Sequence, residues 1–384
     1  MTARLVLAVA CAFAAPAAIP AASAPSAEKL ARMLAVPGLP ANPDQIDWSK
    51  LPTYRGQTSL VARGVEKESA FMHHPHIVVF DGKIFAKWND GYIGEDFAGQ
   101  RVRYSVSRDG KTWGEPVDLT GRHPKRRYTS SGFWSRDGEL YALAALRDAS
   151  DAGPSGEEPL LLAFKYDAKT GRFGERHVIA KDFFAQNIPM RTPSGDWLIL
   201  GKGGVGSWGP MKSAKGGVKS IDDWVIRDLP GAGKLEEAEW YTLPNGDLVS
   251  HFRTRTPKRM MRSYSTDSGV TWTEPVVTDF PESGARHHGL RLSNGMYAFL
   301  VNPNTAGRIP FSIALSKDGL VYDRIANVRA ETTKARHEGR AKSPGYHYMR
   351  GFEHDRKLYT IYSVNKEDIE VTIIPLSEFE ALYR

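Results

Sequence analysis

The chain has 384 residues, and its formal net charge at pH 7 is +7. A basic surface suits nucleic acid, an anionic membrane or an acidic substrate. No nucleic-acid-binding motif is visible, and beyond the first 24 residues no segment is apolar over the length of a membrane span. The single cysteine, Cys11, lies within those first residues, which excludes disulfide and thiol chemistry from the rest of the chain.

Residues 1–24 have the pattern of a secretory signal peptide. Arg4 precedes an apolar run over 5–18, and small residues end the segment at Ala24. We therefore expect a cleaved, exported protein, secreted or periplasmic. Export argues against a nucleic-acid partner and favours an anionic glycan.

A Pro-rich N-terminal extension follows over residues 25–60. It contains a predicted short helix at 30–34 and the start of a predicted strand at 59–62. From there to the end of the chain one structural unit recurs, so we predict a single domain over residues 61–384.

Six β-hairpin signals recur along this domain. Each places Asp-Gly, Asn-Gly or a near equivalent between two alternating apolar segments. They lie at 76–88, 132–142, 193–199, 243–249, 292–298 and 353–359. Repeats of this size are typical of the blades of a β-propeller. The segment 60–71 either closes a seventh blade or completes the last one, so the sequence predicts an all-β propeller of six or seven blades.

Three turns share one sequence pattern. Ser-x-Asp-x-Gly-x-Thr-Trp is complete at 265–272, one residue shorter at 107–113, and ends in tyrosine at 316–322. In such a turn the Ser and Asp side chains bond backbone N–H groups, and glycine takes the positive-φ position. The turns resemble the Asp box, the bacterial neuraminidase repeat of sialidase-like propellers. They predict the fold and say little about the chemistry.

In a propeller, ligands bind at the central axis, which is lined by the residues just before the recurring hairpins. In this chain those positions, and the ends of the second strands, are strongly polar. The residues we predict to contact a substrate there are Arg127, Tyr128, Asn187, Arg253, Arg255, His288, Asn302, Arg308 and Tyr346.

Histidine, tyrosine and arginine dominate this set, and carboxylates are scarce. His and Tyr can supply a base and an acid near neutral pH, and arginine binds a carboxylate through two hydrogen bonds. The set therefore favours an acidic sugar. Metal ligation is a rival use of His73, His74 and His76, but no matching Asp/Glu/His trio is visible in the sequence. We predict no catalytic metal and no cofactor, and leave open a structural cation, such as calcium, on the axis.

A more specific resemblance rests on five segments. They lie at 73–88, 94–113, 132–144, 302–319 and 345–371. Within the sialidase-like propellers these segments are most similar to rhamnosyl-glucuronate lyases, ulvan lyases and a related rhamnosidase. Those lyases cleave next to glucuronate by β-elimination, so the resemblance implies a polysaccharide lyase.

The resemblance also implies a catalytic histidine in the HHPH stretch, helped by tyrosine and arginine. The residues that take these roles here are His73 or His74, Tyr348, Arg308 and Arg127. The chain departs from the family pattern at Met72, where the family has asparagine. A second histidine is expected at 90–93, and Tyr92 is predicted to replace it as acid or base.

β-Elimination requires a cation for the uronate carboxylate, a base for the α-proton and an acid for the departing oxygen, with no carboxylate pair. A glycosidase normally uses two carboxylates. We therefore predict a monomeric, secreted lyase acting on an acidic oligo- or polysaccharide that contains glucuronate or rhamnose. Two alternatives stay open, because fold alone does not choose among them. One is an exo-glycosidase of the sialidase or rhamnosidase type, in which Glu239 would activate Tyr348, and the other is a non-catalytic glycan-binding propeller.

Overall fold

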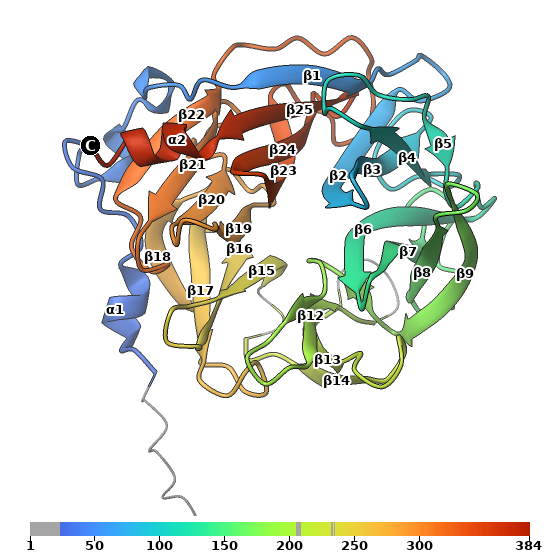
Figure 1. The fold of residues 1–384 in the computed structure, drawn as a ribbon, viewed down its shortest axis with the longest axis horizontal. Coiled ribbons are helices and arrows are strands. Elements are labelled where there is room, and N and C mark those ends of the chain that lie inside the picture. Colours follow the sequence, from blue (N-terminus) through green and yellow to red (C-terminus); the bar gives the residue numbers. More distant parts are fainter. Residues whose placement is uncertain (1–23, 205–208, 232, 234) are drawn as a thin grey trace, which may run out of the picture.

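The computed structural model describes residues 24–204, 209–231, 233 and 235–384, which form six sheets around a central axis (Figure 1). Apart from residue 24, the predicted signal peptide lies outside the described residues. The architecture is an all-β propeller, and of the two predicted blade numbers six is confirmed.

Neighbouring strands in each sheet are antiparallel. In five of the sheets the strand nearest the axis is the first of that sheet's strands in the sequence. The first blade contains β2 (Phe71–Phe80), β3 (Lys83–Gly91), β4 (Arg101–Ser107) and β5 (Val117–Asp118). The second contains β6 (Arg126–Arg136), β7 (Glu139–Asp148), β8 (Leu160–Asp167) and β9 (Arg172–Lys181). The third contains β10 (Phe184–Ala185), β11 (Met190–Arg191), β12 (Trp197–Lys202), β13 (Met211–Gly216) and β14 (Trp224–Asp228).

The remaining blades repeat this order. The fourth contains β15 (Glu236–Thr242), β16 (Leu248–Arg253), β17 (Arg259–Ser265) and β18 (Val276–Pro281). The fifth contains β19 (His288–Arg291), β20 (Tyr297–Val301), β21 (Phe311–Ser316) and β22 (Arg324–Arg329). The sixth contains β23 (Tyr346–His354), β24 (Lys357–Val364), β25 (Asp368–Pro375) and β1 (Gln57–Ala62).

The ring is closed by β1, a strand from the N-terminal side of the domain. It pairs antiparallel with β25, with Gln57 opposite Ile373 and Ser59 opposite Val371 (Figure 1). This pairing covers a sheet edge that would otherwise be open. The segment that could have closed a seventh blade therefore completes the sixth, and the predicted boundary at residue 61 falls inside β1.

The N-terminal extension packs on the side of the fourth and fifth blades. Its helix α1 (Ala27–Ala31) is followed by Met33, whose backbone N–H donates to Asp279 at 2.7 Å. Trp48, in one of two 3₁₀ turns (Pro43–Gln45 and Trp48–Lys50), joins the same apolar cluster as Phe299. The chain ends in α2 (Leu376–Ala381). Among the described residues no helix is long and apolar enough to cross a membrane.

The three repeated turns have the same internal hydrogen bonds. In the turn 265–272, Asp267 accepts from the N–H groups of Val270 and Thr271 at 3.1 and 2.9 Å, and Ser265 accepts from Gly269 at 2.8 Å. The same bonds recur around Asp109 and Asp318. Backbone donors, that of Thr112 first, lower the pKa of the Asp109 carboxyl to about 2.

The glycine of the complete turn fixes one blade against its neighbour. Gly269 has a φ of +82°, and a Cβ added there would lie 2.5 Å from Leu198 Cδ2 of the preceding blade. Close packing between blades leaves no room for a methyl group at this point. The glycine is therefore required both by the backbone conformation and by the contact.

We expect Gly269→Ala to lower the free energy of unfolding by about 1–3 kcal/mol more than Gly246→Ala does. Both glycines have positive φ, +82° and +88°, but no atom lies within 4 Å of a Cβ added at Gly246. The comparison, by thermal or chemical unfolding, separates the packing cost from the backbone cost. Equal losses in the two variants would contradict a packing role for the turn.

Candidate active site

A polar cavity of ≈ 80 Å³ opens on the axis at one end of the propeller. It lies where the inner strands begin, and β2, β6, β15 and β23 converge on that axis (Figure 1). Its lining comes from five of the blades and from the turn that leads into the fifth. The lining residues are His74, Glu95, Asp96, Thr129, Arg147, Phe184, Ala185, Gln186, Lys202, Glu236, Glu237, Arg253, Arg286 and Tyr348.

Three inner strands present a side chain to this cavity through the same backbone irregularity. The pairing register shifts between His73 and His76 in β2, between Glu236 and Glu239 in β15, and between His347 and Arg350 in β23. The first residue of each bulge has positive φ: 50° at His74, 44° at Glu237 and 53° at Tyr348. Bulges re-aim side chains, and non-glycine residues in this region are uncommon. The three residues therefore hold equivalent positions in their blades.

Tyr348 is the centre of the cavity's contacts. Its hydroxyl accepts a hydrogen bond from Arg253 Nη1 at 3.1 Å. The guanidinium carbons of Arg286 and Arg308 lie 5.4 and 5.9 Å from the centre of its ring. Burial raises the pKa of Tyr348 well above its ordinary value, and the nearby Glu237 carboxylate adds to that shift. The phenol is thus neutral at physiological pH.

Glu237 is the anion beside that hydroxyl. Its Oε2 accepts from Arg253 Nη1 at 2.6 Å, and its Oε1 lies 4.0 Å from Arg286 Nε. Burial by itself would raise the pKa of this carboxyl, but Arg253, Arg286 and the Tyr348 hydroxyl together lower it well below the ordinary value. Glu237 is therefore an ionised carboxylate next to a neutral phenol, the pairing in which a base can take the phenol's proton.

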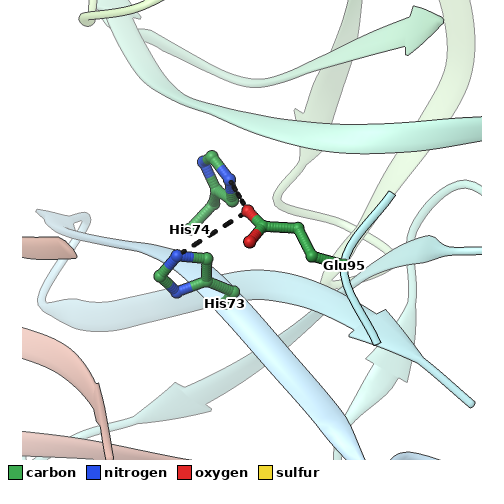
Figure 2. A group of neighbouring side chains, drawn as sticks. All are labelled: His73, His74 and Glu95. Atoms are coloured by element: carbon green, nitrogen blue, oxygen red, sulfur yellow. Dashed lines mark ion pairs between the residues drawn. The ribbon is translucent and has the colours of Figure 1, made fainter. Parts of the chain in front are cut away.

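His73, His74 and Glu95 form a second cluster (Figure 2). The rings of His73 and His74 have their centres 4.0 and 4.8 Å from that of Tyr348. His74 Nε2 lies 3.4 Å from Glu95 Oε1, and Lys366 Nζ donates to Glu95 Oε2 at 2.5 Å. Burial lowers the pKa of His74 to about 4 in spite of Glu95, so its imidazole is neutral at physiological pH.

The possible ligand atoms of this trio lie within 4.8 Å of one another, a spacing compatible with a metal ion. The surroundings do not fit one. Arg286 Nη1 lies 3.4 Å from His74 Nδ1, and because a guanidinium only donates, this contact assigns the ring proton to Nε2. A metal would need the Nε2 lone pair, and it would compete with the Lys366 ammonium for Glu95. The trio is therefore poorly suited to binding a divalent cation.

Comparison with known proteins bears on this arrangement. Residues 206–357 match the family model of the BNR repeat-like domain, and comparison with curated proteins gave no match. Among solved structures, the chain resembles a sialidase at 22% identity and a TM-score of 0.68, over 90% of this chain and 35% of that one. It also resembles Trypanosoma rangeli sialidase in complex with 2,3-difluorosialic acid as a covalent intermediate, at 15% identity and a TM-score of 0.64, over 84% and 60%. A third similar structure is the intramolecular trans-sialidase from Ruminococcus gnavus, at 13% identity and a TM-score of 0.63, over 83% and 98%.

The chain folds as a sialidase-like β-propeller. It spans about a third of the length of the first of these structures and 60% of the second. At these identities the likeness establishes the fold, and the chemistry has to be argued from the residues of the cavity.

The sialidase-like propeller brings several predicted residues together. His74, Tyr348 and Arg253 line the cavity, and His73 and Arg308 lie against the Tyr348 ring. Two others support the lining from behind. Arg127 is bonded to Asp96 and to the carbonyl of Asp148, and the Asn302 amide donates to the Arg308 carbonyl at 3.0 Å.

Other predicted residues lie elsewhere in the propeller. The Tyr128 hydroxyl accepts from Arg176, the Tyr346 hydroxyl donates to Glu331, and both rings belong to apolar clusters between strands. Asn187 accepts from the N–H of Leu200. Arg255 is 61% exposed in its side chain and paired with Glu236. His288 lines a different cavity, of ≈ 140 Å³. Tyr92 is 47% exposed, with the guanidinium of Arg122 3.9 Å from its ring centre.

The expected Tyr348–Glu239 pair is wrong. Glu239 is bonded to His288 at 3.1 Å and to Arg350, whereas Glu237 lies beside Tyr348. Sequence reasoning also missed Glu95 and Lys366, and it placed Arg286 near the axis without assigning it to the site. Arg286 belongs to a polar stretch just before an inner strand, which was the one signal available for it.

His74 makes the folded protein acid-sensitive. Its pKa is about 4 in the folded state against 6.5 for an ordinary histidine. Between those values the unfolded chain binds a proton that the folded chain does not, so stability falls as the pH is lowered through this range. Buried His73, His76 and His347, whose pKa values burial also lowers, act in the same direction.

We expect His74→Gln to reduce the slope of unfolding free energy against pH by up to about 1.4 kcal/mol per pH unit between pH 4 and 6.5. Denaturant unfolding measured at several pH values checks this. His354→Gln, at an exposed histidine, is the control. An unchanged slope in His74→Gln would contradict a neutral, buried His74.

Proposed function

We propose that this chain is a glycoside-processing enzyme that hydrolyses a glycan at an acidic sugar, with Tyr348 as nucleophile. One observation carries the proposal: the Tyr348 hydroxyl is held by Arg253 beside the ionised Glu237, on the lining of the axial cavity. The same cavity carries a cationic set that suits a carboxylate. Arg253 and Arg286 line the cavity beside Tyr348, and Arg308 lies next to it, 5.9 Å from the centre of the Tyr348 ring.

The reaction would proceed in two displacements. Tyr348 Oη attacks the anomeric carbon and passes its proton to Glu237, while the bond between that carbon and the leaving oxygen breaks. Water then attacks the anomeric carbon and loses a proton to solvent, the bond from that carbon to Tyr348 Oη breaks, and Glu237 returns its proton to the phenolate. A neutral nucleophile paired with a base suits an anionic sugar, because an ionised carboxylate nucleophile would be repelled by the substrate. Tyrosine nucleophiles are the known exception to the usual carboxylate pair of glycosidases.

Burial alone would raise the pKa of Glu95, but Lys366 and the two histidines lower it well below its ordinary value, so Glu95 is ionised while His74 is neutral. The leaving oxygen therefore takes its proton from solvent water. In the tautomer fixed by Arg286, His74 carries its proton on Nε2, directed toward Glu95 Oε1 at 3.4 Å. Both residues line the same cavity as Tyr348. The likeness to a sialidase solved as a covalent intermediate supports the two-step scheme. Together with the predicted signal peptide, the scheme describes an exported enzyme that acts on extracellular or periplasmic glycans.

A second candidate is the lyase implied by the sequence resemblance. It is favoured by the contact between His74 and Tyr348, whose ring centres are 4.8 Å apart. The guanidinium of Arg286 lies over the Tyr348 ring. In that scheme the arginines neutralise a uronate carboxylate, and His74 or Tyr348 removes the α-proton. The products separate the two candidates, because elimination leaves an unsaturated uronate that absorbs ultraviolet light and hydrolysis does not.

We expect the mature protein to release free acidic sugar from aryl glycosides of sialic acid or glucuronic acid without a rise in ultraviolet absorbance from an unsaturated product. Tyr348→Phe and Glu237→Gln should each lower kcat on the order of 10³-fold, because they remove the nucleophile and its base. Tyr346→Phe is the matched control, since its ring packs in a blade core and its hydroxyl donates to the exposed Glu331.

Three results would contradict the hydrolase. Full activity in Tyr348→Phe would show that Tyr348 is not the nucleophile. An ultraviolet-absorbing product, lost in His74→Ala, would establish the lyase instead. Binding of acidic glycans with neither product would leave a glycan-binding propeller.

A further inference from the structure

The turn at residues 282–286, between β18 and β19, reaches all three arginines around Tyr348. Arg286 belongs to the turn itself. The Gly284 carbonyl accepts a hydrogen bond from Arg308 Nη2 at 2.8 Å. The open side of Gly284 faces Arg253, because a Cβ added there would lie 3.8 Å from Arg253 Nη2. The position of this turn therefore sets where three guanidinium groups stand relative to one another.

A single buried carboxylate holds the turn in place. Glu282 Oε2 accepts from the backbone N–H groups of Gly284 at 2.6 Å and Ala285 at 3.2 Å. Its Oε1 accepts from the N–H of Thr254 at 3.2 Å, the residue that follows Arg253. One side chain thus ties the turn that carries Arg286 to the end of the strand that carries Arg253.

Glu282 is only 1% exposed. Among the described residues, none of the ion pairs within 4.0 Å includes it, although Arg253 acts on it at longer range. A buried carboxylate without a close cation is costly, and its three backbone donors are the direct partners that offset this cost. The hydrogen bonds of this side chain thus fix the backbone beside the cavity.

We propose that Glu282 is a positioning residue that holds Arg253, Arg286 and Arg308 in the arrangement that binds the substrate carboxylate. The inference rests on the proposed function and adds to it a residue outside the cavity lining. It implies that affinity for the carboxylate, more than the chemical step, depends on Glu282 being ionised.

The ionisation state of Glu282 gives this proposal a pH signature. Burial raises its pKa to about 6, with Arg253 and the three backbone donors acting in the opposite direction. Arg253 faces it from β16, and the turn that it closes carries Arg286 and binds Arg308. The Glu282 N–H donates to the Lys258 carbonyl, while the Lys258 ammonium is bonded to Thr305. As the pH falls through 6, the carboxyl takes up a proton and loses acceptor capacity toward the turn.

The test compares wild type, Glu282→Gln and the control Glu378→Gln, whose carboxylate pairs with Arg55 away from the axis. Glutamine keeps one acceptor oxygen, but its amide NH2 group is a donor and cannot accept from the backbone N–H groups that Glu282 binds. We expect kcat/KM for an acidic aryl glycoside to fall about 10–100-fold in Glu282→Gln, mainly through KM, with circular dichroism and Tm showing an intact fold. The acid limb near pH 6 that wild type shows in kcat/KM should be absent in the variant.

A measurement on the wild type covers the case in which the variant does not fold. Calorimetric binding of sialic acid and of its methyl ester is followed from pH 5 to 7.5. We expect affinity for the acid, and not for the ester, to weaken below about pH 6.

The outcomes separate this inference from the proposed function. Loss of activity in Tyr348→Phe together with wild-type KM and pH profile in Glu282→Gln would overturn the role of Glu282 alone. Parallel pH dependence for acid and ester would do the same. If Tyr348→Phe stayed active, the proposed function would fall, and selective weakening of carboxylate binding in Glu282→Gln would still support the positioning role.

Discussion

The candidate site depends on a β-bulge repeated in three inner strands. A regular strand alternates its side chains between two faces, and the extra residue of a bulge breaks this alternation at one chosen point. His74, Glu237 and Tyr348 each occupy that point with positive φ. Such a conformation costs on the order of 1–3 kcal/mol for a non-glycine residue and persists only where the surrounding structure enforces it. Here the surrounding blades enforce it three times around one axis.

The second constraint is electrostatic. Tyr348 has Arg253, Arg286, Arg308 and Lys366 within 6.0 Å of its hydroxyl or ring, and Glu237 and Glu95 balance part of that charge. Fixed charges in a buried cavity act more strongly than in water and need no rearrangement when a substrate arrives. Four cations stand against two carboxylates here, so an anionic sugar would bring the local charge closer to balance. The charges are held by the backbone as well as by one another, as the contacts of Glu282 and Gly284 demonstrate.

Much of the fold could be predicted from the sequence, because its signals are local. The hairpin dipeptides and the Ser-x-Asp turns are decided by φ preferences and by bonds within a few residues, and they gave the propeller correctly. The blade number stayed open at six or seven because it depends on where one strand, β1, pairs. Its Leu60 lies opposite Glu370, which is 310 residues further along the chain. That pairing has no local signal.

The site was predicted in part, and the reason is again physical. Polar residues before the hairpins identified His74, Arg253 and Tyr348, but strand alternation alone could not decide between Glu237 and Glu239. The bulge in β15 moves the cavity-facing position, so Glu237 reaches Tyr348 and Glu239 turns to His288. The bulge in β23 likewise separates two tyrosines that are two residues apart. Tyr346 packs in an apolar cluster, whereas Tyr348 lines the cavity. Glu95 comes from the segment between β3 and β4, whose approach to the axis only the folded chain reveals.

The most direct test of the account is covalent labelling of the nucleophile. The mature protein is incubated with a fluorinated acidic glycosyl fluoride, which slows hydrolysis of a glycosyl–enzyme intermediate, and the modified peptide is located by mass spectrometry. If Tyr348 is the nucleophile and Glu237 its base, one adduct forms, on Tyr348, and it forms far more slowly in Glu237→Gln. Turnover of acidic glycosides with an adduct on another residue, or with no adduct at all, would contradict it.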